Sequence, residues 1–137
     1  MSAYKKITTQ FKNLESLKKA LADIGFSNFD LAPSPRVNSL SLTGYTGRQG
    51  DDVALRLPRS HYGNYEDTGF AWDETTQTYR AIISTHDGYG NFGEDTLNKV
   101  RQRYAFHEVS RQARLKGYSV KQINDQSGVI RLQLVKL

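Results

Sequence analysis

Hydrophobic and polar residues recur along the chain in two distinct periods, which separate its predicted helices from its predicted strands. Near the N-terminus, four apolar residues recur at spacings of three, four and three: Leu14, Leu17, Leu21 and Ile24. This spacing is the apolar stripe of an amphipathic helix. Asn13 precedes the stripe at the position of an N-cap, and Gly25 follows it at the position of a left-handed C-cap. The pattern therefore predicts a first helix over 14–24.

A second, longer helix is predicted from about residue 94 to residue 116. Glu94 and Asp95 fall in its first turn and basic residues fall in its last, and both placements favour the helix dipole. At ~100° per residue, one side of this helix is apolar and is expected to face a sheet: Leu97, Val100, Tyr104 and Leu115. The core anchors that we expect come from both helices: Leu17, Leu21, Leu97 and Tyr104.

Period-two alternation of apolar and polar residues predicts strands in the rest of the chain. The predicted strands and hairpins are 4–11, 37–44, 52–58, 69–84 and 118–137. Val53, Leu55 and Leu57 alternate with polar residues and are expected to face inward together. The order is β-α-β-β-β-β-α-β-β. Because hairpins give antiparallel neighbours and helices need an apolar face to cover, we predict an α+β fold, an antiparallel-rich sheet with two helices on one face, in a single domain, 1–137.

The net charge, the lack of cysteine and the lack of long apolar runs exclude several classes of protein. The chain of 137 residues has a formal net charge of +5, which favours an acidic partner but is too mild to identify nucleic acid. It contains no cysteine, which excludes disulfides, thiolate zinc sites and a cysteine nucleophile. No secretory h-region is visible, and no apolar run approaches the ~18 residues of a membrane span. We therefore expect a soluble, basic, cytoplasmic protein with no membrane partner; a prokaryotic or plastid interior fits this expectation.

A second side of the long helix carries the charges that could bind a partner. It is lined by Lys99, Arg103, His107, Ser110 and Arg114, with Arg111 beside it. Arginines on this side could bind phosphates or carboxylates, and an unpartnered charged face is the alternative. We expect Arg103 and Arg114 to be exposed while Tyr104 anchors the helix inward. Three residues in predicted loops extend the candidate surface: Tyr45, Arg48 and Arg59.

A third, smaller side of the same helix is also apolar and consists of Phe106, Val109 and Ala113. We expect this side to pack against the first helix, because two helices on one face of a sheet are neighbours. Contact with another protein is the alternative.

Three groups of residues that could carry chemistry have ordinary structural explanations. The glycines of "GYTGRQGDD" (44–52) fit neither the Walker pattern nor the dinucleotide fingerprint, so we expect a turn. The 84–95 loop gathers histidine and carboxylates without a familiar metal-ligand spacing. An acid–base pair of His61 or His86 with Asp67 is conceivable, but nothing in the sequence places them together. We assign no catalytic residue, no metal ligand and no cofactor.

Several segments together resemble a known family. They are "YKKITTQFKNLESLKKALADIGF", "GYTG" followed by "DDVALRLP", "DTGFAWD" and "QRYAFHEV". They are similar to a conserved hypothetical chloroplast reading-frame family of unknown function, found in plastid genomes and cyanobacteria. The resemblance covers 4–137, and Arg103 to His107, "RYAFH", is its most specific piece. The family's tryptophan-bearing stretch is replaced here by "STHDGYGNFGED" (84–95), so no role is carried over to that loop.

The resemblance implies a photosynthetic-lineage setting, with which a cyanophage copy of the gene is equally compatible. It implies no catalytic residues. The leading hypothesis is a non-enzymatic binding or adaptor protein that acts on another macromolecule, with an acidic protein as partner. A nucleic-acid-binding protein that uses the basic side of the second helix is the alternative. A small-molecule enzyme that uses histidine and aspartate is the third hypothesis.

Overall fold

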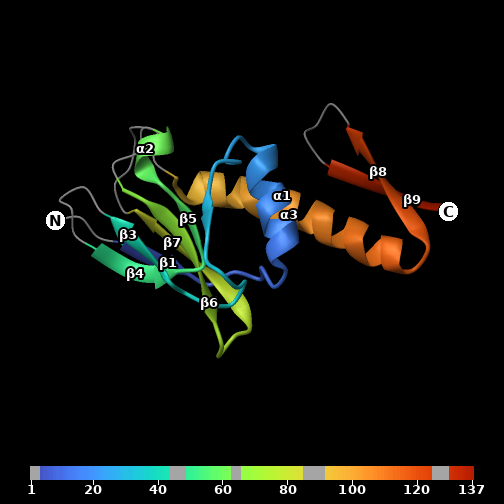
Figure 1. The fold of residues 1–137 in the computed structure, drawn as a ribbon. Helices are drawn as coiled ribbons and strands as arrows, with labels where there is room; N and C mark the ends of the chain where they lie inside the picture. The colour runs from blue at the N-terminus through green and yellow to red at the C-terminus, as the bar shows by residue number, and fades with distance from the viewer. Residues whose placement is uncertain (1–3, 44–48, 63–65, 85–91, 125–129) are drawn as a thin grey trace.

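The structure is a computed structural model that describes residues 4–43, 49–62, 66–84, 92–124 and 130–137. A central antiparallel sheet lies beside two helices, and a separate hairpin projects at the C-terminal end (Figure 1). The α+β class predicted from the sequence is confirmed, and the order of helices and strands broadly matches the predicted order. Within the described residues, no helix is long and apolar enough to span a membrane.

The central sheet has five strands in the order β1-β7-β6-β5-β2, each antiparallel to its neighbour. Its strands are β1 (Tyr4–Ile7), β2 (Asp30–Leu31), β5 (Leu55–Leu57), β6 (Thr68–Asp73) and β7 (Thr78–Ser84). Two hairpins form separate sheets: β3 (Leu40–Thr43) with β4 (Gln49–Val53), and β8 (Tyr118–Asn124) with β9 (Ile130–Lys136). The helices are α1 (Leu14–Asp23), a single turn α2 (Arg59–Tyr62) and α3 (Glu94–Leu115). The sequence did not predict the short elements β2 and α2.

The helices α1 and α3 cover one face of the central sheet. Their apolar side chains share one core cluster with side chains from β5, β6 and β7: Leu17, Leu21, Leu97, Val100, Leu55, Phe70, Tyr79 and Ile83. The β3–β4 hairpin packs on the opposite face, where Leu42 and Val53 contact Ile82. The sheet is therefore buried on both sides, with helices on one face and a hairpin on the other.

The segment predicted as one strand at 52–58 is two strands, β4 and β5, which meet at Ala54. Val53 belongs to the cluster on the hairpin side, whereas Leu55 and Leu57 belong to the cluster on the helix side. The expectation that these three residues face the same way is therefore wrong. The buried Ala54 amide and carbonyl bond to two other segments, which satisfies the backbone where the chain passes from one sheet to the other.

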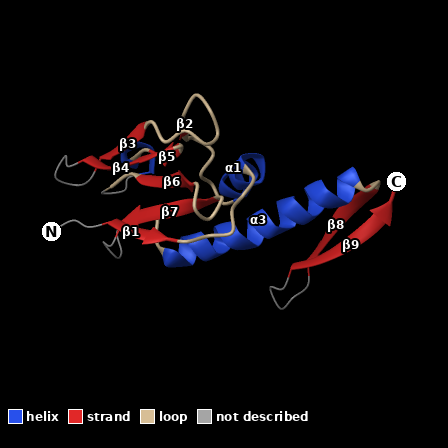
Figure 2. Cartoon of the chain, turned by 90° about the horizontal axis from the view of Figure 1, so that it is seen from below, coloured by secondary structure: helices blue, strands red, loops and turns tan. Residues whose placement is uncertain are grey.

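The C-terminal hairpin lies beside the second half of α3, away from the central sheet (Figure 2). The helix α3 has 22 residues and runs past the sheet. Leu115, expected to face the sheet, is therefore 77% exposed. The expectation for Leu115 is wrong because the periodic stripe continues beyond the surface that it covers.

Candidate protein-binding surface

Tyr104 fixes the position of α3 relative to the start of α1. It is 8% exposed, and the other three expected anchors, Leu17, Leu21 and Leu97, are fully buried. The Tyr104 hydroxyl accepts hydrogen bonds from the backbone N–H groups of Lys12, at 2.8 Å, and Asn13, at 3.0 Å. Burial raises the pKa of this hydroxyl, so it stays protonated. These two hydrogen bonds to the main chain, together with packing, thus fix which side of α3 faces the start of α1.

The middle of the basic side of α3, at Arg103 and His107, faces α1 rather than solvent. Arg103 Nε donates to Asp23 Oδ2 at 2.8 Å, and its Nη1 donates to Gln122 Oε1 on β8 at 2.8 Å. His107 Nε2 lies 2.6 Å from the same Asp23 oxygen. The side chains of Arg103 and His107 are only 22% and 17% exposed. The expectation that Arg103 is exposed is therefore wrong: it joins α3 to α1 and to the C-terminal hairpin.

The third side of α3 does not pack as expected. The Arg103 guanidinium lies over the Phe106 ring, 4.6 Å from its centroid, which is a cation–π contact. Ala113 is buried, but Val109 is 43% exposed. The expectation that this side packs against α1 is therefore wrong for Val109, since the basic side of α3 occupies that position.

Replacing Asp23 with asparagine should lower stability at neutral pH. Burial alone would raise the pKa of the Asp23 carboxyl, but hydrogen bonds from His107 and Arg103 outweigh it and hold the pKa below its ordinary value of 3.8. A carboxylate of this kind stabilises the fold above its unfolded pKa, and the contribution is lost as the pH falls through the folded value. We expect Asp23→Asn to cost about 1.5–3 kcal/mol at pH 7, the range for hydrogen bonds to a charged group.

Urea unfolding of the two proteins between pH 7 and pH 2 measures this effect, and the difference between them should shrink below pH 3.8. Glu15→Gln is a matched control, because Glu15 pairs with Lys18 at the surface and is 67% exposed. The control should change stability by less than about 1 kcal/mol. An Asp23→Asn protein as stable as the wild type at pH 7 would show that the carboxylate does not join the helices.

A groove of about 510 Å³ lies between α1, α3 and β8, and we call it the α1–α3–β8 groove. Its apolar lining consists of Phe106, Leu115 and Val120. Its basic lining consists of Lys19, His107, Arg111 and Arg114, and Glu15 is the acidic residue among those that line it. The groove therefore combines an apolar surface with an excess of positive charge.

Two of the cations in the groove have no partner within the described part of the chain. Arg111 is bound to Glu108, with N–O distances of 2.9 and 3.0 Å, and this contact lowers the pKa of the Glu108 carboxyl. Neither the Lys19 side chain nor the Arg114 side chain makes a hydrogen bond or an ion pair with a described residue. The buried Ser110 hydroxyl oxygen likewise has no hydrogen-bond partner there. The Lys19 and Arg114 side chains in the groove thus remain free to bind a ligand.

The family is shown by comparison with known proteins. A model of a family described as "Protein of unknown function (DUF1257)" matches residues 20–133, which run from α1 into β9. The chain belongs to this family. No curated protein and no solved structure matches the chain. The match to DUF1257 includes α3 and β8, so most of the residues that line the groove lie within the matched region. The N-terminal segment "YKKITTQFKNLESLKKALADIGF" begins before that region, at Tyr4.

The remaining candidate residues of this DUF1257 chain are not gathered in the groove. Lys99 is exposed, two turns of α3 before His107. Arg59 begins α2, on the side of the molecule where the central sheet lies (Figure 1). Tyr45 and Arg48 lie outside the described residues. The structure therefore brings together His107, Arg111 and Arg114, with Lys19, Val120 and Leu115 added by the fold.

The conceivable acid–base residues have other contacts. Asp67 is buried, and its carboxylate accepts hydrogen bonds from two backbone N–H groups, that of Thr43 at 2.8 Å and that of Arg59 at 2.7 Å. It therefore joins β3 to α2. His61 is exposed and lies 3.3 Å from the carbonyl of Asn28. His86 lies outside the described residues. Asp67 thus has a structural role, and no described histidine contacts it.

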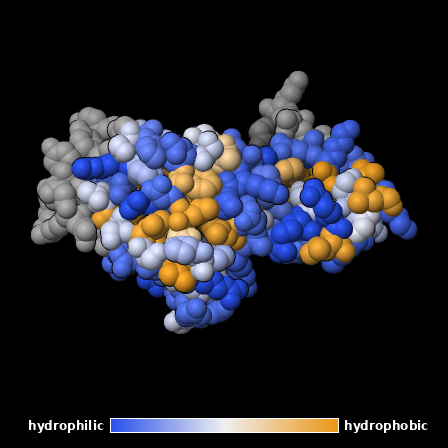
Figure 3. Space-filling view, viewed as in Figure 1, coloured by the Kyte–Doolittle hydropathy of each residue, from blue (hydrophilic) through white to orange (hydrophobic). Residues whose placement is uncertain are grey.

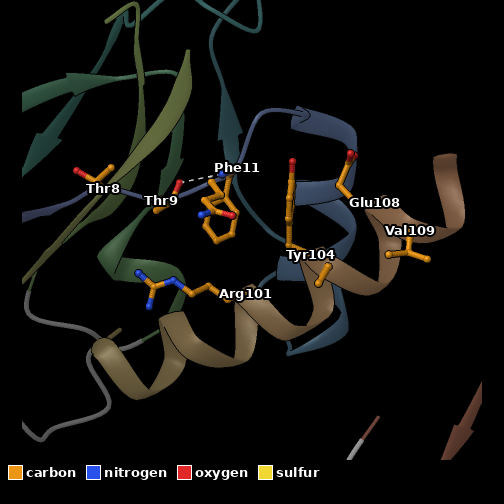
Figure 4. Close-up of a pocket in the computed structure, with 9 residues that line it drawn as sticks. Thr8, Thr9, Phe11, Arg101, Tyr104, Glu108 and Val109 are labelled. Carbon is orange, nitrogen blue, oxygen red and sulfur yellow. Dashed lines mark hydrogen bonds between the residues drawn. The ribbon is translucent and has the colours of Figure 1, made fainter. Parts of the chain in front are cut away.

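A second pocket, of about 570 Å³, lies beside the middle of α3 (Figure 4). Thr9 and Phe11 lie on one wall, and Tyr104 and Glu108 on the other. Two of the polar side chains on these walls are already bonded: Thr9 Oγ1 accepts from the Phe11 amide at 3.1 Å, and Glu108 accepts from the Ser16 hydroxyl at 2.7 Å. For this reason we favour the α1–α3–β8 groove as the binding site.

Proposed function

We propose that this chain is a non-enzymatic binding protein that holds an acidic segment of another protein in the α1–α3–β8 groove. The observation that carries the proposal is the pairing of an apolar lining with Lys19 and Arg114, which have no partner in the described part of the chain. Carboxylates on the segment would form charge-assisted hydrogen bonds with these cations. Its apolar side chains would cover Phe106 and Val120.

The chemistry of the groove supports a protein partner over a nucleic acid. Binding to a phosphate backbone draws its affinity from several phosphate contacts at once. Here Arg103 and His107 share Asp23, and Arg111 is bound to Glu108. The basic side of α3 therefore presents fewer available cations than its sequence suggests. An apolar lining with few cations is closer to the composition of a protein interface.

We further propose a cytoplasmic setting, in a cyanobacterial cell or a plastid stroma. The absence of cysteine fits an interior compartment, where thiols and disulfides contribute little to stability. The resemblance of "RYAFH", "GYTG" and "DTGFAWD" to a plastid and cyanobacterial family supports the photosynthetic lineage, and a cyanophage-borne copy would act in the same compartment.

Reversing the two available cations should remove the partner without unfolding the protein. Lys19 and Arg114 are exposed, and their side chains make no hydrogen bond or ion pair in the described part of the chain. We expect Lys19→Glu with Arg114→Glu to cost about 1 kcal/mol or less, mainly because Arg114 lies in the last turn of α3, where a cation favours the helix dipole. The same variant should lose the acidic partner in a pull-down from cyanobacterial lysate, identified by mass spectrometry. The difference should be largest at low salt, because the Debye length is about 10 Å at 0.1 M and shrinks above it.

The matched control is Lys99→Glu with Arg101→Glu, which makes the same change in charge on exposed positions of α3 outside the groove. The control should retain the partner. Arg103→Glu is unsuitable as a test, because it would place a second carboxylate beside Asp23. A folded Lys19→Glu and Arg114→Glu protein that retains every partner would refute the proposal. Loss of the captured material after nuclease treatment would favour the nucleic-acid alternative.

A further inference from the structure

The strand β9 has one edge without a partner among the described residues. It pairs with β8 along all seven of its residues, and no other described strand pairs with it. The hairpin contacts the rest of the protein through β8 and α3 (Figure 2). A two-stranded hairpin is marginally stable, and three or more strands give a stable sheet. The hairpin therefore gains stability if another strand is added to β9.

The hydrogen bonds of the hairpin define which backbone groups point outward from this edge. The N–H of Leu137 donates to the carbonyl of Gly117 at 2.9 Å, which makes these opposite residues a hydrogen-bonded pair. In an antiparallel ladder, hydrogen-bonded and non-hydrogen-bonded pairs alternate. The backbone groups of residues 131, 133 and 135 therefore point to β8. Those of Leu132, Leu134 and Lys136 point away from it.

The two leucines lie on the side of the hairpin that faces α3. Leu132 is opposite Gln122, whose side chain reaches Arg103 of α3, and Leu134 is opposite Val120, which lines the groove. Leu132 and Leu134 nevertheless remain 37% and 57% exposed. The space-filling view shows apolar surface on this C-terminal part of the molecule (Figure 3). The apolar side of β9 is thus only partly covered by α3.

We propose that β9 pairs with β9 of a second copy of this chain, antiparallel and about a two-fold axis through Gln133. Gln133 is the middle residue of the strand, so this register overlaps all seven residues. Leu132 then lies opposite Leu134 of the partner subunit, and Leu134 lies opposite Leu132 of the partner subunit. Every outward backbone group from 130 to 136 gains a hydrogen-bond partner.

The distribution of charge along β9 favours a second copy in this register. Arg131 and Lys136 lie near the two ends of the strand, and the central residues 132–135 are uncharged. Arg131 then faces Val135 of the partner subunit, so no cation lies opposite another cation. Like charges directly opposite one another would destabilise the pair. The carboxylates of an acidic segment would pair best with Arg131 and Lys136 at the ends of β9. They would not cover the exposed Leu132 and Leu134 between them.

The two-fold axis also explains the exposed leucines. An axis perpendicular to the sheet maps each face onto itself, so the result is a continuous sheet in the order β8-β9-β9-β8 with both α3 helices on one face. Four leucines meet at its centre, between the two helices. The pairing uses up both free β9 edges and closes at two copies. No residue of β9 lines the α1–α3–β8 groove.

Sedimentation equilibrium over a wide range of protein concentration tests the proposal. The wild-type mass should rise from one chain to two. Leu134→Pro should remain a single chain throughout, because it removes an N–H that points outward and not one that bonds to β8. A second variant, Leu132→Lys with Leu134→Lys, places cations opposite cations and should also stay monomeric. Val37→Lys, at another exposed apolar position, should dimerise like the wild type.

Circular dichroism of each variant establishes that it is folded. A wild-type protein that stays a single chain at every concentration, or folded β9 variants that still dimerise, would overturn the proposal. So would growth into larger polymers, since the pairing closes at two. Monomeric wild type that captures a lysate protein through β9 would show that another chain, not a second copy, occupies the edge. The Lys19→Glu and Arg114→Glu protein should dimerise normally, which separates this test from that of the groove.

Discussion

Leu21→Ala is expected to lower the free energy of unfolding by about 2–5 kcal/mol, the range for a buried leucine. Leu21 is fully buried in the cluster where α1 and α3 meet the central sheet. Truncation removes the apolar contacts and leaves a cavity, because the surrounding side chains come from three different elements and cannot all move into it.

Urea unfolding followed by circular dichroism measures the loss. Lys19→Ala is the matched control on the same helix, since Lys19 is exposed and alanine favours a helix. The control should change stability by about 0.5 kcal/mol or less. A loss below that value for Leu21→Ala would mean that the apolar stripe of α1 does not form the core.

The apolar stripe of α1 could be predicted because it depends on local information. Its period, the Asn13 cap and the glycine that follows all lie within one short segment. The structure has each of them: Asn13 Oδ1 accepts from the Ser16 N–H at 2.9 Å, and Gly25 adopts a φ of 97°. The hairpins were predictable for the same reason, since turn residues lie between strands that are adjacent in sequence.

The environment of the basic side of α3 could not be predicted. Angular sorting correctly places Arg103 and His107 on one side of the helix, but it does not say what that side faces. The answer depends on Asp23, which is about 80 residues earlier and lies on α1. The groove likewise needs Lys19 from α1 and Val120 from β8. No local signal connects these residues, because their proximity results from the packing of α1 and the hairpin against α3.

The same limit explains the incorrect expectations for Leu115 and Val53. Periodicity identifies the side of an element on which a residue lies, but not where the covering surface ends. The stripe on α3 continues past the sheet, and the chain changes sheets at Ala54. Both positions depend on how far one element extends over another, which is a property of tertiary packing.

Gly69→Ala is expected to destabilise the protein by about 1–3 kcal/mol, the usual cost of overpacking a core. Gly69 lies on β6, beneath the β3–β4 hairpin. A Cβ atom added there would lie 2.6 Å from Val53 Cγ1, 2.9 Å from Val53 Cγ2 and 2.9 Å from Leu42 Cδ2. Leu42 and Val53 are both fully buried, and Val53 is β-branched, so its methyl groups cannot withdraw without moving the hairpin.

A double-mutant cycle with Val53→Ala separates this clash from other effects of a new side chain. Val53→Ala alone should destabilise the protein by leaving a cavity. In the double variant, the new alanine of β6 occupies space that the valine methyl groups have left. The two changes should therefore cost less together than the sum of the separate losses, with a coupling of about 0.5–3 kcal/mol for contacting residues. Strictly additive losses would show that the two side chains do not compete for the same space. Additive losses would therefore mean that the close approach of the β3–β4 hairpin does not explain the glycine at position 69 of β6.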